Sequence, residues 1–289
     1  MSHLRPDLPR SLPRILHPSR LYSSSRLIPE SLAGKKCLVT GASRGIGLAI
    51  ATRFARESAR CVLVGRDERS LKKAVESLDA ITADKGGRTE LGRHEVRVGD
   101  VGELSFWEAM GKEMKDIDIL INAAGQTHYS LLMSTPPAII DQVIGTNLMG
   151  TIWSCRTFSR SMVRRKQGSI INIASLLALQ GGRGSAAYAA SKAGILGLTR
   201  SLAAEVGPSG VRVNAIVPGY IETQMTEGYF FPPKQLLRMT STARAGTTDA
   251  IPLKRLGKAE EVADAAVFLA TNAYANNCVV NLDGGLSAV

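Results

Sequence analysis

The chain has 289 residues, 44% of them hydrophobic, enough to bury a sizeable core in one or two domains. Its net charge of +11 is spread along the sequence, and no basic stretch is interleaved with aromatic residues, so no nucleic-acid partner is expected. The apolar runs are shorter than the roughly 18 residues that span a bilayer. The four cysteines and four histidines are scattered, which predicts neither a disulfide framework nor a metal site.

Residues 1–32 precede the first apolar strand pattern and form a basic segment. They are rich in Arg and Ser, poor in acid and without lysine, which are traits of transit peptides. The run Arg20-Leu21-Tyr22-Ser23 resembles an arginine-based mitochondrial processing site with cleavage before Ser23. An amphipathic helix would be interrupted by Pro6, Pro9, Pro13 and Pro18, so a disordered basic tail is the alternative. We expect a targeting segment that directs the protein to the mitochondrial matrix.

A strand pattern at 36–40 leads into a turn with glycines at positions 41, 45 and 47, followed by a helical pattern from about Ile46 to Arg56. Such glycines let the backbone approach a pyrophosphate and let the helix pack close to the strand. The helix N-terminus then offers free N–H groups to phosphates. The segment predicts a cofactor site, although a plain strand–helix turn also uses glycine and the spacing differs from GxGxxG.

The remainder of region 33–289 alternates short apolar runs with helical patterns, without internal repeats or a sign of a second domain. That alternation predicts βαβ units and hence an α/β fold, a doubly wound (Rossmann) parallel sheet of seven strands in a single domain. The expected strands are 36–40, 60–65, 94–98, 117–122, 169–174, 211–217 and 278–282.

The segment 227–250 interrupts this alternation, since it is irregular and contains Pro232-Pro233, Gly246 and several threonines. A long loop of this kind inside a compact domain is commonly functional or disordered. We therefore expect either a substrate lid or a surface insertion.

Tyr188, Lys192 and Ser175 form the most informative constellation. Residues four apart share one face of a helix, so Lys192 lies one turn from Tyr188. A nearby ammonium lowers the pKa of a phenol, which predicts that Tyr188 exchanges a proton near neutral pH. Ser175 follows the apolar run 170–174, where its hydroxyl can hydrogen-bond a substrate carbonyl. A YxxxK pair on a helix surface is the alternative if this motif is taken alone.

Together these motifs resemble the short-chain dehydrogenase/reductase family over roughly residues 33–286. The shared elements, in order, are TGxxxGxG at 40–47, Asn122-Ala123-Ala124-Gly125, Asn147, Ser175, Tyr188-x3-Lys192 and Pro218-Gly219. Three further stretches, 219–226, 251–257 and 283–285, are similar to the 3-oxoacyl-acyl carrier protein reductase branch. One departure is Ala123, where the family often has a second asparagine.

The resemblance implies four catalytic residues and a cofactor, NADPH. Tyr188 would protonate the developing alkoxide, Ser175 would bind the same oxygen, and Lys192 would hold the nicotinamide ribose. Asn147 would anchor a water that links Lys192 to solvent, with a helix kink as its alternative role. The implied cofactor-binding residues are Gly41, Ser43, Arg44, Gly45, Ile46, Gly47, Arg66, Asp100, Asn122, Ala123, Gly125, Tyr188, Lys192, Pro218, Gly219, Ile221 and Thr223.

The choice of NADPH depends on the end of the second strand, where an acid binds the ribose of NAD and a base accommodates the NADP phosphate. Arg66 occupies that position and Arg44 supplies a second cation, whereas Asp67 comes one residue later and is expected to face solvent.

The resemblance also implies the reaction, the reduction of a 3-oxoacyl thioester on acyl carrier protein in mitochondrial fatty acid synthesis. A broad carbonyl or quinone reductase and a non-catalytic subunit of a hetero-oligomer are the alternatives.

In this family, helices near 138–166 and 188–206 pair the subunits, so a homotetramer is expected. Burial against the chain's own sheet also explains the apolar faces of these helices. Arg164-Arg165-Lys166 is a candidate docking cluster for the acidic carrier protein, with helix C-terminal charge placement as its alternative. A second docking position, before strand six, is basic in related reductases but is Ser209 here, which is a departure from their pattern.

Overall fold

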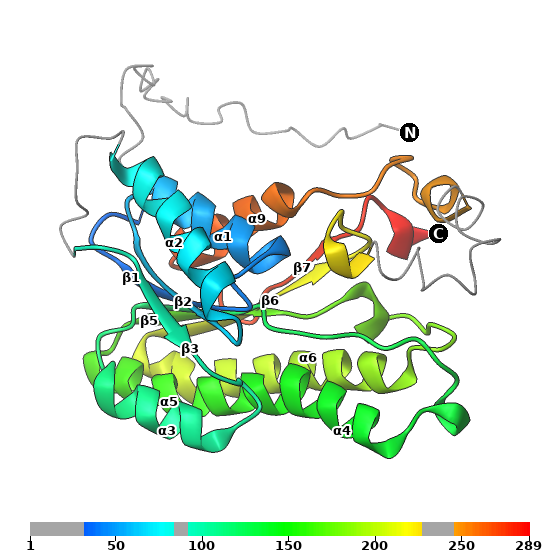
Figure 1. Ribbon diagram of the computed structural model, residues 1–289, viewed down its shortest axis with the longest axis horizontal. Coiled ribbons are helices and arrows are strands. Elements are labelled where there is room, and N and C mark those ends of the chain that lie inside the picture. Colours follow the sequence, from blue (N-terminus) through cyan, green and yellow to red (C-terminus); the bar gives the residue numbers. More distant parts are fainter. Residues whose placement is uncertain (1–31, 84–91, 227–245) are drawn as a thin grey trace, which may run out of the picture.

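The seven expected strands form one parallel sheet in the order β3-β2-β1-β4-β5-β6-β7. The computed structural model describes residues 32–83, 92–226 and 246–289 (Figure 1). The strands are β1 Lys36–Thr40, β2 Arg60–Gly65, β3 Glu95–Val98, β4 Ile119–Asn122, β5 Gly168–Ile173, β6 Val211–Pro218 and β7 Val279–Leu282. The predicted fold class is confirmed, with every strand boundary within two residues of its expected place.

Helices cover both faces of the sheet (Figure 1). One layer holds α1 Gly45–Arg56, α2 Glu68–Ala83 and α9 Ala259–Thr271; the other holds α3 Leu104–Glu113, α4 Pro137–Ile144, α5 Gly150–Arg165 and α6 Ala186–Val206. Successive strand residues point to opposite faces. Cys37 and Val39 therefore enter the core beneath the first layer, while Leu38 enters the core beneath the second. Two covered faces explain the near-continuous apolar runs of the sequence.

The expected helix near 138–166 is interrupted by one π-helical turn, Gly145–Met149, between α4 and α5. This turn contains Asn147, which has no exposed surface. Single π turns inside α-helices are common at functional sites because they redirect a side chain from the regular spiral. The kink expected as an alternative role of Asn147 is thus present.

Several apolar residues of α5 and α6 pack into the chain's own core. Phe158, Ile195, Leu202 and Val206 are buried within the single chain. The chain's own core therefore accounts for much of the pattern that also suggested a subunit interface. Among the described residues, no helix combines the length and apolarity needed to cross a membrane.

The loops that follow the strands at the carboxyl edge of the sheet lie against one another between β1 and β4. Thr40 Oγ1 accepts hydrogen bonds from the backbone N–H groups of Ala123 and Ala124, each at 3.0 Å. Because the strand order reverses at β1 and β4, this is the switch point where open α/β sheets bind ligands.

Candidate active site

Two contiguous cavities occupy the carboxyl edge of the sheet. The first, about 260 Å³, lies over the loops after β1, β2 and β3, and the second, about 430 Å³, lies over those after β5 and β6. Their shared wall consists of Ile46, Ala123, Gly125, Thr223 and Met225. An elongated ligand can therefore extend from one cavity into the other.

The glycines of the first loop hold its backbone close to its neighbours. At Gly41, whose φ is +65°, a Cβ atom would lie 2.7 Å from Ala124 Cα, and at Gly47 it would lie 2.4 Å from Gly41 O. The loop leads into α1, whose first residue is Gly45 and whose N-cap, Arg44, makes no side-chain capping bond. The first N–H groups of α1 therefore remain available for an anion in the first cavity.

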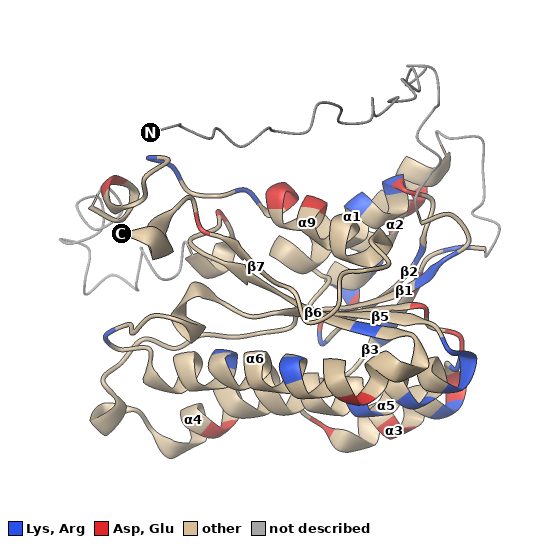
Figure 2. Ribbon diagram, turned by 180° about the vertical axis from the view of Figure 1, so that it is seen from behind, with Lys and Arg blue, Asp and Glu red and all other residues tan. Residues whose placement is uncertain are grey.

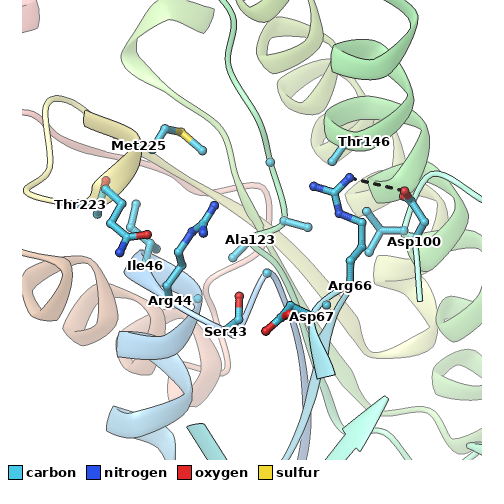
Figure 3. Close-up of a pocket in the computed structure, with 18 of the residues that line it drawn as sticks. Ser43, Arg44, Ile46, Arg66, Asp67, Asp100, Ala123, Thr146, Thr223 and Met225 are labelled. Carbon is cyan, nitrogen blue, oxygen red and sulfur yellow. Dashed lines mark ion pairs between the residues drawn. The ribbon is translucent and has the colours of Figure 1, made fainter. Parts of the chain in front are cut away.

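Two arginines and two aspartates line the first cavity (Figure 3). Arg66 is exposed and its Nη1 lies 3.8 Å from Asp100 Oδ2, while Arg44 lines the opposite wall. Asp67 was expected to face solvent, and it is exposed, but it also lines the cavity. Ser70 lowers the pKa of this carboxyl, first through its side-chain hydroxyl and then through its backbone N–H, which donates to Asp67 Oδ1 at 2.7 Å. The sequence signal for a cavity position of Asp67 was that it directly follows Arg66.

The second cavity contains the Ser–Tyr–Lys constellation. Ser175 follows β5, whereas Tyr188 and Lys192 lie one turn apart on α6, and all three line the cavity. Ser175 and Tyr188 are hydrogen-bonded through their side chains. Lys192 is buried, with 4% of its surface exposed, and its Nζ donates to Ile173 O at 2.8 Å. The sequence spacing therefore predicted a real cluster.

The electrostatics of this cluster differ from the expectation that Lys192 lowers the pKa of Tyr188. Burial raises the pKa of Tyr188, and only the Ser175 hydrogen bond offsets this. The Lys192 ammonium lies 5.9 Å from the centre of the Tyr188 ring. Burial also lowers the pKa of Lys192 to about 8. In this geometry Tyr188 stays protonated at neutral pH, as a proton donor must.

Asn147 lies behind the cavity wall and not on it. Its Oδ1 accepts from Gln126 N at 2.9 Å, and its Nδ2 donates to Gln126 O and to Ser191 Oγ, each at 3.0 Å. A Cβ atom on Gly125 would lie 3.4 Å from Asn147 Oδ1 and 3.6 Å from Lys192 Nζ. Asn147 thus approaches the lysine across Gly125, while the water expected there stays a prediction.

Asn122 is the second predicted residue that lines neither cavity. Its side chain points into the protein, where Nδ2 donates to Asn172 Oδ1 at 2.8 Å and Oδ1 accepts from Ser154 Oγ at 2.6 Å. It supports the loop from below. The other predicted residues line one cavity or both: Gly41, Ser43, Arg44, Gly45, Ile46, Gly47, Arg66, Asp100, Ala123, Gly125, Ser175, Tyr188, Lys192, Pro218, Gly219, Ile221 and Thr223.

The structure adds cavity residues that the sequence did not single out. In the first cavity they include Thr146 and Met225, and in the second Tyr129, Gln180, Arg183 and Tyr220. Thr146 lies in the π-helical turn Gly145–Met149 and Met225 in a short helical turn, whereas the residues named for the second cavity lie on loops. Over the described ranges, no three His, Cys, Asp or Glu side chains gather as a metal site would require.

The predicted docking cluster lies away from these cavities. Arg165 ends α5, which precedes β5, so the cluster is at the amino edge of the sheet, whereas the cavities are at the carboxyl edge. Arg165 is also committed to the fold, since Nη1 contacts Asp118 Oδ1 at 2.8 Å and Nη2 donates to Ile117 O. Figure 2 shows the basic end of α5 on the side of the molecule away from α4. Ser209, before β6, lies at the same amino edge.

Comparison with known proteins gives consistent matches. The family model described as short chain dehydrogenase matches residues 35–231. The rat 3-oxoacyl-[acyl-carrier-protein] reductase is 38% identical over 253 residues, 87% of this chain and 98% of that protein. Carbonyl reductase family member 4 from Xenopus laevis is 34% identical over 256 residues, with the same 87% and 98% covered.

Among solved structures, a putative NAD(P)-dependent gluconate 5-dehydrogenase from Beutenbergia cavernae with bound NADP superposes with a TM-score of 0.80. It is 35% identical, and the match covers 90% of this chain and all of that one.

Proposed function

This chain belongs to the short-chain dehydrogenase family, and from that premise we propose that it is an NADPH-dependent oxidoreductase that reduces 3-oxoacyl thioesters of acyl carrier protein. The observation that carries the proposal is the complete set of Ser175, Tyr188 and Lys192 in one cavity, joined to a cavity with a phosphate-binding loop. A non-catalytic subunit would not need such a set. The rat and frog relatives support the thioester substrate and keep a broad carbonyl reductase as the second candidate.

The residues of the first cavity fit a phosphorylated dinucleotide. The tightly packed glycines and the uncapped N-terminus of α1 suit the pyrophosphate, and Arg44 and Arg66 suit a phosphate on the ribose. Asp100, Ala123 and Thr223 line the intervening wall. When bound, this cofactor supplies the hydride for the carbonyl carbon.

The residues of the second cavity then manage the substrate oxygen and its proton. Ser175 donates a hydrogen bond that fixes the carbonyl oxygen. Tyr188, protonated because burial raises its pKa, gives its proton to that oxygen as negative charge develops. Lys192 places a positive charge below the phenol, which favours the tyrosinate left behind. Asn147 positions the loop at Gly125 through its bonds to Gln126.

One assay distinguishes the candidates. Oxidation of NADPH is followed with acetoacetyl-acyl carrier protein, acetoacetyl-CoA and a set of quinones side by side. The proposal requires the highest kcat/KM on the carrier-protein thioester. A preference for quinones, with little turnover of either thioester, would establish the carbonyl reductase instead, and no turnover of any substrate would favour a supporting subunit.

Arg66 is expected to determine the choice of cofactor. Arg66→Asp removes a cation and leaves three carboxylates, with Asp67 and Asp100, beside the ribose phosphate. Charge-assisted hydrogen bonds contribute about 1.5–3 kcal/mol, so the ratio of kcat/KM for NADPH over NADH should fall by roughly 10- to 100-fold. Lys73→Asp, an identical charge change on exposed α2 surface, is the control and should keep the ratio. Equal efficiency with both cofactors in the unmodified enzyme would contradict the assignment.

We propose in addition that residues 1–32, of which 1–31 lie outside the described residues, direct import into the mitochondrial matrix. The mature protein should then begin near Ser23. Deleting residues 1–28 should leave NADPH oxidation intact and strand the enzyme in the cytosol. N-terminal sequencing of protein from purified mitochondria decides the matter, since an N-terminus at Met1 or Ser2 is incompatible with processing.

We propose also that the enzyme is a homotetramer and that the segment 227–250 closes over the substrate. Residues 227–245 of that segment lie outside the described residues, while 246–250 are helical. Met225 and Thr226, which precede it, line the second cavity, so the segment leaves the domain at the cavity mouth. Sedimentation analysis of the purified protein tests the tetramer.

A further inference from the structure

The second cavity carries positive charge without a matching acid. Its described lining contains two cationic side chains, Lys192 and Arg183, and neither Asp nor Glu. Lys192 is buried beside Tyr188, whereas Arg183 is exposed. Within the described ranges no hydrogen bond or ion pair engages the Arg183 guanidinium, in contrast to Arg165, which is bound to Asp118. The exposed end of the cavity therefore presents a cation that the fold does not use.

A packed turn fixes the position of Arg183. Ser185 N donates to Gly182 O at 3.1 Å, which closes a four-residue turn with Arg183 second and Gly184 third. Gly184 has a φ of +79°, as the third residue of a type II turn requires, and its carbonyl accepts from Ser130 N at 3.0 Å. A Cβ atom on Gly184 would lie 2.7 Å from the Tyr129 ring. The neighbouring segment Tyr129–Ser130 thus holds the turn, through a hydrogen bond from Ser130 and the close approach of the Tyr129 ring.

The turn also has a fixed relation to the catalytic tyrosine. Ser185 is the N-cap of α6, and Tyr188 lies in its first turn. Five peptide units separate Arg183 from Tyr188, which limits their Cα separation to about 17 Å at full extension. The turn and the start of α6 make the actual Cα separation shorter than this limit, whereas the length of the arginine side chain extends the distance over which Arg183 can bind an anion. An anion bound by Arg183 at the mouth can therefore belong to the same substrate molecule whose carbonyl meets Tyr188.

The rest of the lining of the second cavity is uncharged, with Leu176, Leu177 and Tyr129 among its residues. A ligand that matches this arrangement has a carbonyl at one end, a long uncharged arm and an anion at the other. The other cation of the lining, Lys192, is bonded to Ile173 O beside Tyr188, so Arg183 is the cation left for an anionic group of the substrate. A thioester on a phosphopantetheine arm has the required order of groups.

We propose that Arg183 is a specificity-determining residue that binds the phosphate of the phosphopantetheine arm of the substrate. This inference rests on the proposed thioester reduction. The phosphate is common to acyl carrier protein and coenzyme A, so the chemistry of the contact is shared by both sources. Arg183 acts through binding and takes no part in the transfer of the proton.

The test uses two substrates that differ only in that phosphate, acetoacetyl-pantetheine and acetoacetyl-4′-phosphopantetheine. In the unmodified enzyme the phosphorylated substrate should have the lower KM. Arg183→Gln should raise its KM by about 5- to 20-fold, as expected for an exposed charge-assisted contact, with kcat nearly constant because the contact is equal in ground and transition states. The KM values of the two substrates should then nearly coincide. Arg183→Lys, which keeps the charge but loses the fork, should lie between.

A matched control separates a local contact from general attraction of anions. Lys112→Gln removes the same charge from α3 at the amino edge of the sheet and should leave the KM ratio of the two substrates unchanged. Repeating the Arg183→Gln comparison with acetoacetyl-CoA and acetoacetyl-acyl carrier protein identifies which source uses the contact.

The inference and the proposed function fail in different ways. If the unmodified enzyme reduces both pantetheine thioesters but Arg183→Gln raises both KM values equally, or neither, the phosphate contact is wrong and thioester reduction stands. If Lys112→Gln gives the same shift as Arg183→Gln, the effect is not local and the inference is overturned. If the unmodified enzyme reduces no thioester at all, both are overturned.

Discussion

Replacing Tyr188 with phenylalanine should lower kcat by about 10²–10⁴-fold, the usual contribution of a positioned general acid. The substitution removes one hydroxyl and keeps the ring in place on α6. Ser175 loses its side-chain partner, but Lys192 keeps its bond to Ile173 O, so the wall of the cavity is maintained. Steady-state turnover of acetoacetyl-acyl carrier protein measures the loss.

Binding of NADPH provides the necessary comparison, because a damaged cavity would lower kcat for a different reason. The dissociation constant of NADPH, from the change in its fluorescence, should be nearly the same in Tyr188→Phe and in the unmodified enzyme. Tyr274→Phe, at a tyrosine that is 97% exposed, should change neither quantity. A Tyr188→Phe enzyme with near-normal kcat would show that another group delivers the proton.

The sheet could be predicted from the sequence because its strands are buried on both faces. Each strand is then an uninterrupted apolar run bounded by turn residues, and β1 and β2 were located without error. The Tyr188–Lys192 pair could be predicted for a related reason, since a helix converts a spacing of four into contact.

Features that depend on contacts between distant segments could not be predicted. Arg165 stands between two other basic residues at a helix end in the sequence, yet its partner, Asp118, is 47 positions away. Asn122 belongs to a cofactor motif, but the buried Asn172 and Ser154 turn its side chain inward. The pKa of Tyr188 was predicted in the wrong direction because desolvation depends on the whole cavity and outweighs one neighbouring charge.

Lys192→Met should abolish most turnover and also remove a pH dependence of stability. Burial lowers the Lys192 pKa from 10.5 to about 8 in the folded protein, while in the unfolded chain the amine keeps its ordinary value. Between those two values the unfolded state binds more protons, so the free energy of unfolding rises with pH across that window. Equivalently, the stabilisation is complete above pH 10.5 and is lost as the pH falls through about 8.

The size of that effect makes it measurable against other titrations. Each pKa unit corresponds to about 1.4 kcal/mol, so the cofactor-free enzyme should gain roughly 2 kcal/mol relative to Lys192→Met between pH 7 and pH 9.5. Urea unfolding of both proteins at each pH gives the difference, in which every group other than Lys192 cancels. At neutral pH, methionine removes the destabilising buried charge but leaves Ile173 O without its donor, and these two opposing effects are of similar magnitude. The variant should therefore fold about as well as the unmodified enzyme at pH 7 while its kcat falls by 10²-fold or more. A difference in unfolding free energy that stays constant from pH 7 to 9.5 would mean that Lys192 is not held in a desolvated site.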